Sequence, residues 1–177
     1  YFIKTHGGDD SAFKTIVVSG SNSVMPHAIA SNRIIKINDS VLIDFGVSSY
    51  GYNSDLTRIF SLGKINTYYR KIYSIVKDAQ RIAIDYIKPG VRISEIEMKV
   101  RDYLDKKGLE KFFGHSLGHG IGREVHELPK ISRDNRELFK ENMVFTVEPG
   151  VYIPKLAGFR HEDMVVVTKY GCEVLTQ

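Results

Sequence analysis

Four carboxylates stand inside apolar segments of the sequence, where strands are expected. Asp44 lies within VLIDFG, Asp55 begins DLTRIF, Glu148 interrupts VFTVEPG and Glu162 precedes DMVVV. A buried carboxylate without a partner is costly, so each of these groups needs a cation or a proton. This placement is unusual for a solvated surface and indicates a site that binds cations or moves protons.

Each carboxylate also has a simpler explanation when it is taken alone. Asp44 and Glu148 could belong to turns, and Asp55 and Glu162 could form ion pairs with arginines three and two residues away. The four simpler explanations are independent, so all of them would have to hold by coincidence. A single metal centre accounts for all four carboxylates together, and we therefore favour it.

The stretch GHSLGHGIGREVHELP supplies the imidazoles for such a centre. It places His115, His119 and His126 among glycines, which let a backbone pass close to a pocket. The alternative for His119 is a loop histidine held by hydrogen bonds, and the alternative for His115 is a histidine that faces the core. A carboxylate-rich set with one imidazole, from His119, suits Mn²⁺, Co²⁺, Fe²⁺ or Zn²⁺.

The composition bounds the remaining possibilities. The chain has 177 residues, 42% of them hydrophobic, which fits one domain with a core. Its net charge of +4 comes from interleaved basic and acidic residues, so neither a nucleic-acid nor a membrane partner is expected. The single cysteine, Cys172, excludes an internal disulfide and favours a cytoplasmic location. We find no transmembrane run and no signal peptide.

The elements that must position these residues follow from periodicity. Apolar residues recur at helical spacing over residues 69–87, before Pro89, and again over residues 96–104, where Ser94 and Glu97 have the spacing of a capping box. The opening YFIKTHGG is typical of the end of a helix. Strands are expected in KTIVVSG, SVLIDFGV, LTRIFSLG, MVFTVEPGVYI and EDMVVVTKYG. The class is α+β, with two groups of strands separated by a pair of helices.

Several motifs together resemble one known family. They are SNSVMPHA, VLIDFGVSSYGYNSDLTRIF, GHSLGHGIGREVHELP, MVFTVEPGVYIP and GFRHEDMVVVTKYGCEVL. They are similar to the catalytic domain of the pita-bread (creatinase/aminopeptidase) metallopeptidases, most closely to the Xaa-Pro peptidases aminopeptidase P and prolidase. The resemblance implies one domain over residues 1–177, with pseudo-twofold halves and a curved antiparallel sheet flanked by helices. It also implies that this domain is N-terminally incomplete, because relatives carry an N-terminal domain and further helices before it.

The resemblance also implies the site and its chemistry. Two divalent metal ions are expected, Mn²⁺ or Co²⁺ first and Zn²⁺ or Fe²⁺ as alternatives. Asp44 would bind one ion, His119 and Glu148 the other, and Asp55 and Glu162 would contact both. A metal-bridging hydroxide would attack the scissile carbonyl of an Xaa-Pro peptide bond, with Glu148 as general base and acid.

Further residues receive roles by the same resemblance. His27 and His126 would hydrogen-bond the carbonyl or the oxyanion on opposite sides of the substrate. His115 and Tyr152 would line the substrate site or pack behind it, and Arg160 would support a ligand carboxylate. The expected partner is a peptide with proline at its second position, either a dipeptide or a longer chain, and relatives form homodimers.

Three alternatives use the same fold. Methionine aminopeptidases share the ligands, but their segment between the two glutamates is longer than the fourteen positions from Glu148 to Glu162. A protein-interaction domain or a metal-free hydrolase like creatinase would lose ligands, whereas this sequence keeps all five. Xaa-Pro hydrolysis is therefore the favoured function.

Overall fold

The structure, a computed structural model, describes residues 1–176 and is mixed α and β, as expected from the sequence. Its helices are α1 (Phe2–Thr5), α2 (Thr67–Tyr86) and α3 (Ile93–Lys106), with 3-10 turns η1 (Gly20–Val24) and η2 (Glu110–Phe112). Its strands are β1 (Asp10–Ser11), β2 (Ile16–Ser19), β3 (Ser40–Phe45), β4 (Val47–Ser49), β5 (Tyr52–Asn53), β6 (Leu56–Ser61), β7 (Gly118–Gly120), β8 (Glu127–Ile131), β9 (Val144–Val147), β10 (Gly150–Ile153), β11 (Ala157–Arg160), β12 (Asp163–Val167) and β13 (Cys172–Val174). Within residues 1–176, no helix is both long and apolar enough to span a membrane.

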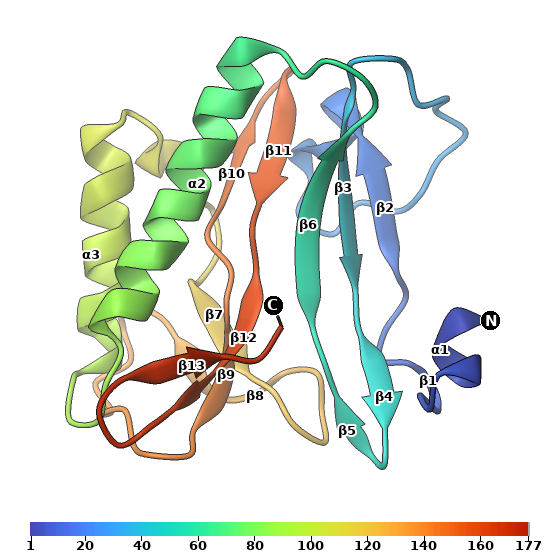
Figure 1. Cartoon of the computed structure of the whole chain (residues 1–177). Coiled ribbons are helices and arrows are strands. Elements are labelled where there is room, and N and C mark those ends of the chain that lie inside the picture. Colours follow the sequence, from blue (N-terminus) through green and yellow to red (C-terminus); the bar gives the residue numbers. More distant parts are fainter. Residues whose placement is uncertain (177) are drawn as a thin grey trace.

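The strands form antiparallel sheets in two groups. The N-terminal group contains the sheets β2-β3-β6 and β1-β4-β5, and the C-terminal group contains the five-stranded sheet β13-β12-β9-β7-β8 and the hairpin β10-β11. Helices α2 and α3 pack against each other on the side of the C-terminal strands, away from β2, β3 and β6 (Figure 1). The fold therefore brings the two strand groups together with helices on one side.

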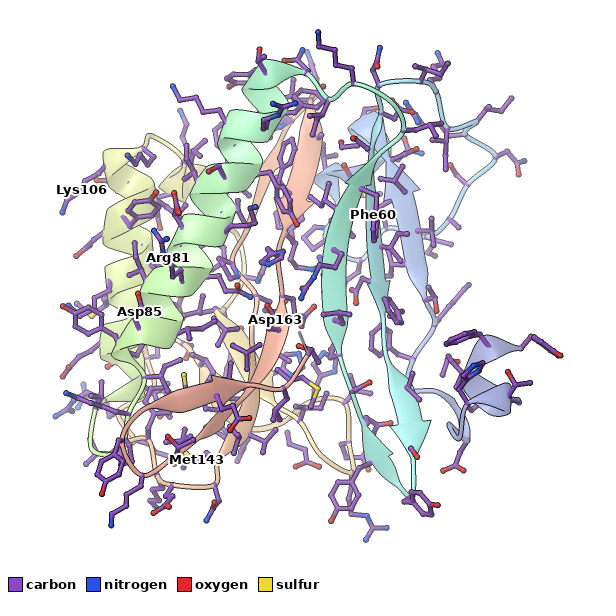
Figure 2. The ribbon with its side chains drawn as sticks, in the orientation of Figure 1. Phe60, Arg81, Asp85, Lys106, Met143 and Asp163 are labelled. Atoms are coloured by element: carbon purple, nitrogen blue, oxygen red, sulfur yellow. The ribbon has the colours of Figure 1, made fainter. Side chains whose placement is uncertain are left out.

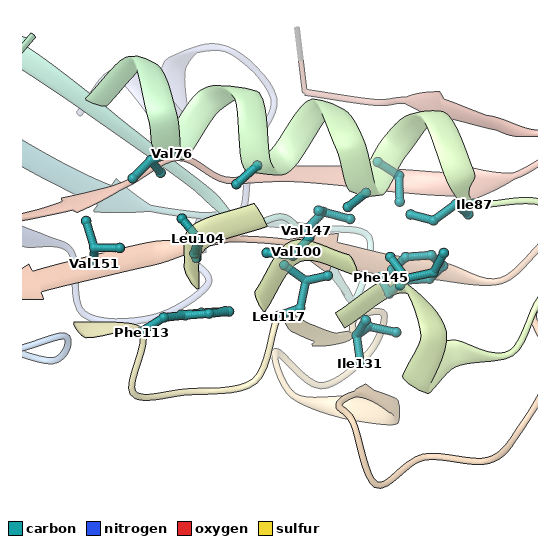
Figure 3. Packing of buried hydrophobic residues seen from close by; sticks show 14 of the residues in the cluster. Val76, Ile87, Val100, Leu104, Phe113, Leu117, Ile131, Phe145, Val147 and Val151 are labelled. Atoms are coloured by element: carbon teal, nitrogen blue, oxygen red, sulfur yellow. The ribbon is translucent and has the colours of Figure 1, made fainter. Parts of the chain in front are cut away.

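The main core lies between the two helices and the C-terminal strands. Val76 of α2 and Val100 and Leu104 of α3 are fully buried, and they belong to one cluster with Phe145 and Val147 of β9 (Figure 3). Burying one such side chain contributes about 1.5–3 kcal/mol. Strand β9 is thus part of the main core, and Glu148 is the residue that follows its end.

The predicted helices are confirmed, but the capping box at Ser94 is wrong. Helix α3 begins one residue earlier, at Ile93, and Ser94 lies inside its first turn. The N–H groups of Ile93 and Ser94 donate to carbonyls of residues 137 and 135, so a neighbouring segment satisfies the helix start. Glu97 instead pairs with Arg101, whose Nε lies 2.7 Å from its carboxylate.

The five predicted strand segments are confirmed, and the glycine-rich stretch holds two more strands, β7 and β8. Gly118 permits this pairing, because a Cβ atom there would lie 1.9 Å from the carbonyl oxygen of Thr146 on β9. His119 follows directly on β7 and is thus presented by a sheet.

Candidate metal centre

The N-terminal strands supply two of the carboxylates. Asp44 lies on β3 opposite Thr57 of β6, and Asp55 comes immediately before β6. Only 8% of Asp44 and 5% of Asp55 are exposed. One oxygen of each carboxylate, Oδ1, is buried and has no hydrogen-bond partner among the described residues. Such orphaned anionic oxygens are costly unless a cation or proton meets them.

The C-terminal strands supply the other two carboxylates. Strands β9 and β12 pair with Val147 opposite Asp163, so that Glu148 and Glu162 are each the adjoining residue beyond that pair. Glu162 is buried, and its Oε2 accepts a hydrogen bond of 2.6 Å from the Thr57 hydroxyl. Glu148 is the more open of the two, with 16% of its side chain exposed.

His119 presents one ring nitrogen to these carboxylates. Its Nδ1 lies 3.1 Å from the Gly120 carbonyl oxygen and donates to it, which leaves Nε2 with a free lone pair. Nε2 lies 3.4 Å from Glu148 Oε1 and 3.7 Å from Asp55 Oδ2. Potential ligand atoms of Asp55, His119 and Glu162 all lie within 4.8 Å of one another.

The carboxylates repel one another in a buried setting. Burial, followed by the nearby charges of Glu162 and Asp44, raises the pKa of Asp55 to about 9. Burial raises the pKa of Glu162 to about 7, although Arg160 opposes this, and it also raises the pKa of Glu148. Divalent cations would relieve this repulsion and use the orphaned oxygens, so the donor set fits hard or borderline metal ions.

Arg160 is the buried cation of the site, and it contacts Asp44. Its Nη2 forms an ion pair with Asp44 Oδ2, its Nε donates to the Thr57 hydroxyl at 3.0 Å, and its Nη1 donates to the Tyr152 hydroxyl at 2.9 Å. Nη1 also donates to the Pro26 carbonyl. The structure thus places Arg160 against Asp44, one of the candidate ligand carboxylates.

Both ion-pair explanations from the sequence are wrong. Arg58 pairs with Asp163, which leaves Asp55 without it. Arg160 pairs with Asp44, while Glu162 is buried and bound to Thr57.

His115 and Tyr152 continue the hydrogen bonds from Arg160. His115 Nδ1 donates to the Ser116 carbonyl at 2.8 Å, so its Nε2 accepts from the Tyr152 hydroxyl at 3.1 Å. Burial lowers the pKa of His115 to about 4 and keeps its ring neutral. Both ring nitrogens are therefore engaged within the protein, which favours an orienting role over direct contact with a ligand.

A cavity of about 700 Å³ opens onto the centre. The five proposed ligands line it, together with His115, Arg160 and the two exposed histidines His27 and His126. The rings of His119 and His126 lie 4.3 Å apart between centroids. The remaining lining residues, which sequence reasoning did not identify, are Phe13, Lys14, Ile16, Pro26, Ser116, Val125, Glu127, Leu128 and Lys130. Thr57 was also missed, because nothing distinguishes it from an ordinary strand threonine.

Comparison with known proteins places the chain in a family. The model of metallopeptidase family M24 matches residues 1–169. The chain is 44% identical to an Xaa-Pro dipeptidase of Pyrococcus furiosus and 42% identical to one of Pyrococcus horikoshii, in each case over 177 residues. These matches cover 100% of this chain but 51% and 50% of the relatives, so the chain spans about half of their length.

Solved structures agree with the sequence comparison. The prolidase of Pyrococcus furiosus superimposes with a TM-score of 0.97 at 44% identity, covering 100% of this chain and 52% of that one. An X-Pro aminopeptidase of Thermotoga maritima gives a TM-score of 0.97 at 43% identity, covering 100% and 50%. The fold is the pita-bread fold of these enzymes. The chain belongs to metallopeptidase family M24.

Proposed function

We propose that this chain is the catalytic part of a peptidase that hydrolyses the bond between an N-terminal residue and a proline at the second position. The observation that carries the proposal is the convergence of four buried or half-buried carboxylates and one imidazole on a single cavity. The similarity to Xaa-Pro dipeptidases supports the choice of substrate.

The five ligand residues would hold two divalent ions, Mn²⁺ or Co²⁺. His119 would bind through Nε2, because its Nδ1 is engaged by the Gly120 carbonyl. Asp44 and Asp55 would use the Oδ1 atoms that otherwise lack partners. When bound, such ions lower the pKa of water and polarise a carbonyl oxygen.

Glu148 is the residue best placed to move a proton. Its side chain is more exposed than that of Glu162 and lines the cavity, so a substrate and a water can reach it. Burial raises the pKa of this carboxyl, which makes it a stronger proton acceptor than an exposed glutamate. Glu148 would take the proton of the attacking water and pass it to the leaving proline nitrogen.

His27 and His126 would stabilise the charge that develops on the carbonyl oxygen. Both are exposed at the cavity, and among the described residues neither ring forms a hydrogen bond, so both rings are free to meet a ligand. A preorganised donor of this kind contributes about 3 kcal/mol to a transition state.

The cavity also suits a proline-containing peptide. Proline has no N–H, so a site that relies on hydrogen bonds to the backbone of the substrate cannot hold it well. Here the apolar side chains of Phe13, Ile16 and Leu128 line the cavity beside the carboxylates. The carboxylates of the site would bind the free α-amine of the substrate, while these apolar side chains would contact its proline ring.

The test is metal-dependent release of the first residue from an Xaa-Pro dipeptide and an Xaa-Pro tripeptide, beside a Met-Ala peptide. The natural protein that contains this chain is assayed with Mn²⁺ or Co²⁺, and Asp55→Ala is the matched variant. Cleavage of Xaa-Pro peptides that is lost in Asp55→Ala supports the proposal, and the preferred length separates a dipeptidase from an aminopeptidase. Preference for Met-Ala would indicate a methionine aminopeptidase, and metal binding without any cleavage would indicate an interaction domain. A homodimer and a cytoplasmic location stay predictions.

A further inference from the structure

Gln80 is a polar residue on the buried face of helix α2. Within this described helix it is the one polar side chain among the buried residues, which are otherwise Ile72, Val76, Ala79 and Ala83. Only 6% of Gln80 is exposed. A buried amide costs free energy unless it is hydrogen-bonded, so the partners of Gln80 show what holds it there.

Those partners are the two strands that deliver the glutamates. Gln80 Nε2 donates to the Val147 carbonyl of β9 at 3.1 Å and to Asp163 Oδ2 of β12 at 2.9 Å. Val147 directly precedes Glu148, and Asp163 directly follows Glu162. One amide thus bridges the two strands at the ends next to Glu148 and Glu162.

Asp163 links this amide to the N-terminal sheet. Figure 2 shows Asp163 at the junction between α2 and β6. Its Oδ1 pairs with Arg58 and accepts from the Thr176 hydroxyl at 2.9 Å, and Arg58 also donates to the Glu162 carbonyl. Its Oδ2 has Gln80 as its hydrogen-bond donor, with His161 Nε2 farther away at 3.9 Å.

We propose that Gln80 is a positioning residue that fixes the separation and orientation of Glu148 and Glu162, an inference that rests on the proposed metallopeptidase function. The pairing of β9 with β12 holds Val147 opposite Asp163, but the two glutamates lie beyond that pair. The two hydrogen bonds of Gln80 attach the neighbours of both glutamates, Val147 and Asp163, to a helix that is itself packed in the main core. Groups that hydrogen-bond metal ligands directly typically change metal affinity or activity roughly 10- to 100-fold when they are removed, and Gln80, which acts one residue away, is expected at the low end of that range.

The experiment compares three variants of the natural protein. Gln80→Met has a similar length but no donor, and Gln80→Glu keeps the shape but can donate at most one hydrogen, so it cannot bond to Val147 and Asp163 together. Val76→Ala is the matched control, because Val76 is buried on the same face of α2 in the same core but makes no hydrogen bond to the site. Mn²⁺ binding to the metal-free protein is measured by calorimetry, together with urea unfolding, kcat and KM.

We expect both Gln80 variants to weaken Mn²⁺ binding by about 10-fold and to lower kcat more than they raise KM. Val76→Ala should lower the urea midpoint while leaving the Mn²⁺ affinity unchanged. Wild-type Mn²⁺ affinity in folded Gln80→Met or Gln80→Glu would overturn the inference, as would an equal loss in Val76→Ala. If the unaltered protein binds no Mn²⁺, the proposed function fails first and the inference fails with it.

Discussion

The metal-free protein should lose stability as the pH rises from about 7 to about 9, chiefly because of Asp55. Folding raises the pKa of this carboxyl from 3.8 to about 9. In this pH range the folded chain therefore keeps a proton that the unfolded chain has released. Each pH unit then lowers the free energy of unfolding by up to about 1.4 kcal/mol, and the total across the range is about 2 kcal/mol because the folded carboxyl itself begins to ionise near pH 9. Glu148, whose pKa is also raised, acts with the same sign.

The range is chosen because other shifted groups titrate outside it. Burial lowers the pKa of His115 and His161 to about 4, and these groups act with the opposite sign, but only below the ordinary histidine value of 6.5. Glu162, with a pKa of about 7, ionises mainly at the start of the range and adds little to the decline above it. The pKa of Cys172 is about 11, so its effect lies mainly above the range.

The assay is urea unfolding in chelator at several pH values, for the wild type and Asp55→Asn. The substitution removes the carboxyl that carries the effect, so its stability should fall less steeply with pH. Saturating Mn²⁺ should also remove the wild-type decline, because bound cations favour the ionised carboxylates. The reasoning is refuted by a chelated wild type whose stability is flat or rises over this range, or by an equal slope in Asp55→Asn.

Two further predictions concern single residues. Glu148→Gln should lower kcat roughly 100- to 10,000-fold while the thermal midpoint in chelator is kept, because a proton acceptor is lost without a change in volume; retained turnover would assign the proton transfer elsewhere. Gly118→Ala should destabilise the fold severely, since its Cβ would lie 1.9 Å from the Thr146 carbonyl oxygen, whereas Gly114→Ala, with nothing within 4 Å, should be tolerated in thermal unfolding. Equal midpoints for these two alanine variants would contradict the packing of β7 on β9.

The sequence was most informative where a polar residue broke an apolar pattern. Asp44, Asp55, Glu148 and Glu162 could be predicted to share one site because a carboxylate in a strand conflicts with burial, and the structure brings them to one cavity. His119 could be identified only together with them, since a histidine between glycines has many explanations. Its strand, β7, was not predicted, because three residues of the type Gly-His-Gly carry no strand propensity of their own.

Residues whose partners are distant in sequence could not be found in this way. Thr57 binds Glu162 across 105 positions, and Gln80 binds Val147 across 67. Gln80 does interrupt the apolar face of a helix, which is the same kind of signal that revealed the carboxylates. A lone amide in a helix is weaker evidence than a set of four carboxylates, because glutamine is a good helix former that often lies at a surface.

The centre lies where the two strand groups meet, and hydrogen bonds and ion pairs cross this junction. Arg160 of β11 reaches Asp44 of β3, and Thr57 of β6 reaches Glu162. Metal ions held by Asp44 and Asp55 on one side and by Glu148 and Glu162 on the other would add cross-links of the same kind. Ligand binding to the folded state alone adds stability by mass action, and here that stability would be greatest where the two groups meet.

Removal of metal should therefore loosen the junction before it loosens the helices. In amide hydrogen exchange near neutral pH, we expect chelation to accelerate exchange in β6 and β12, while Val100 and Leu104 of α3 stay protected because they belong to the main core. Addition of Mn²⁺ should restore protection at the strands alone. Equal acceleration in α3 and β6 would show that the metal stabilises the whole chain as one unit, and would contradict a junction held by its ligands.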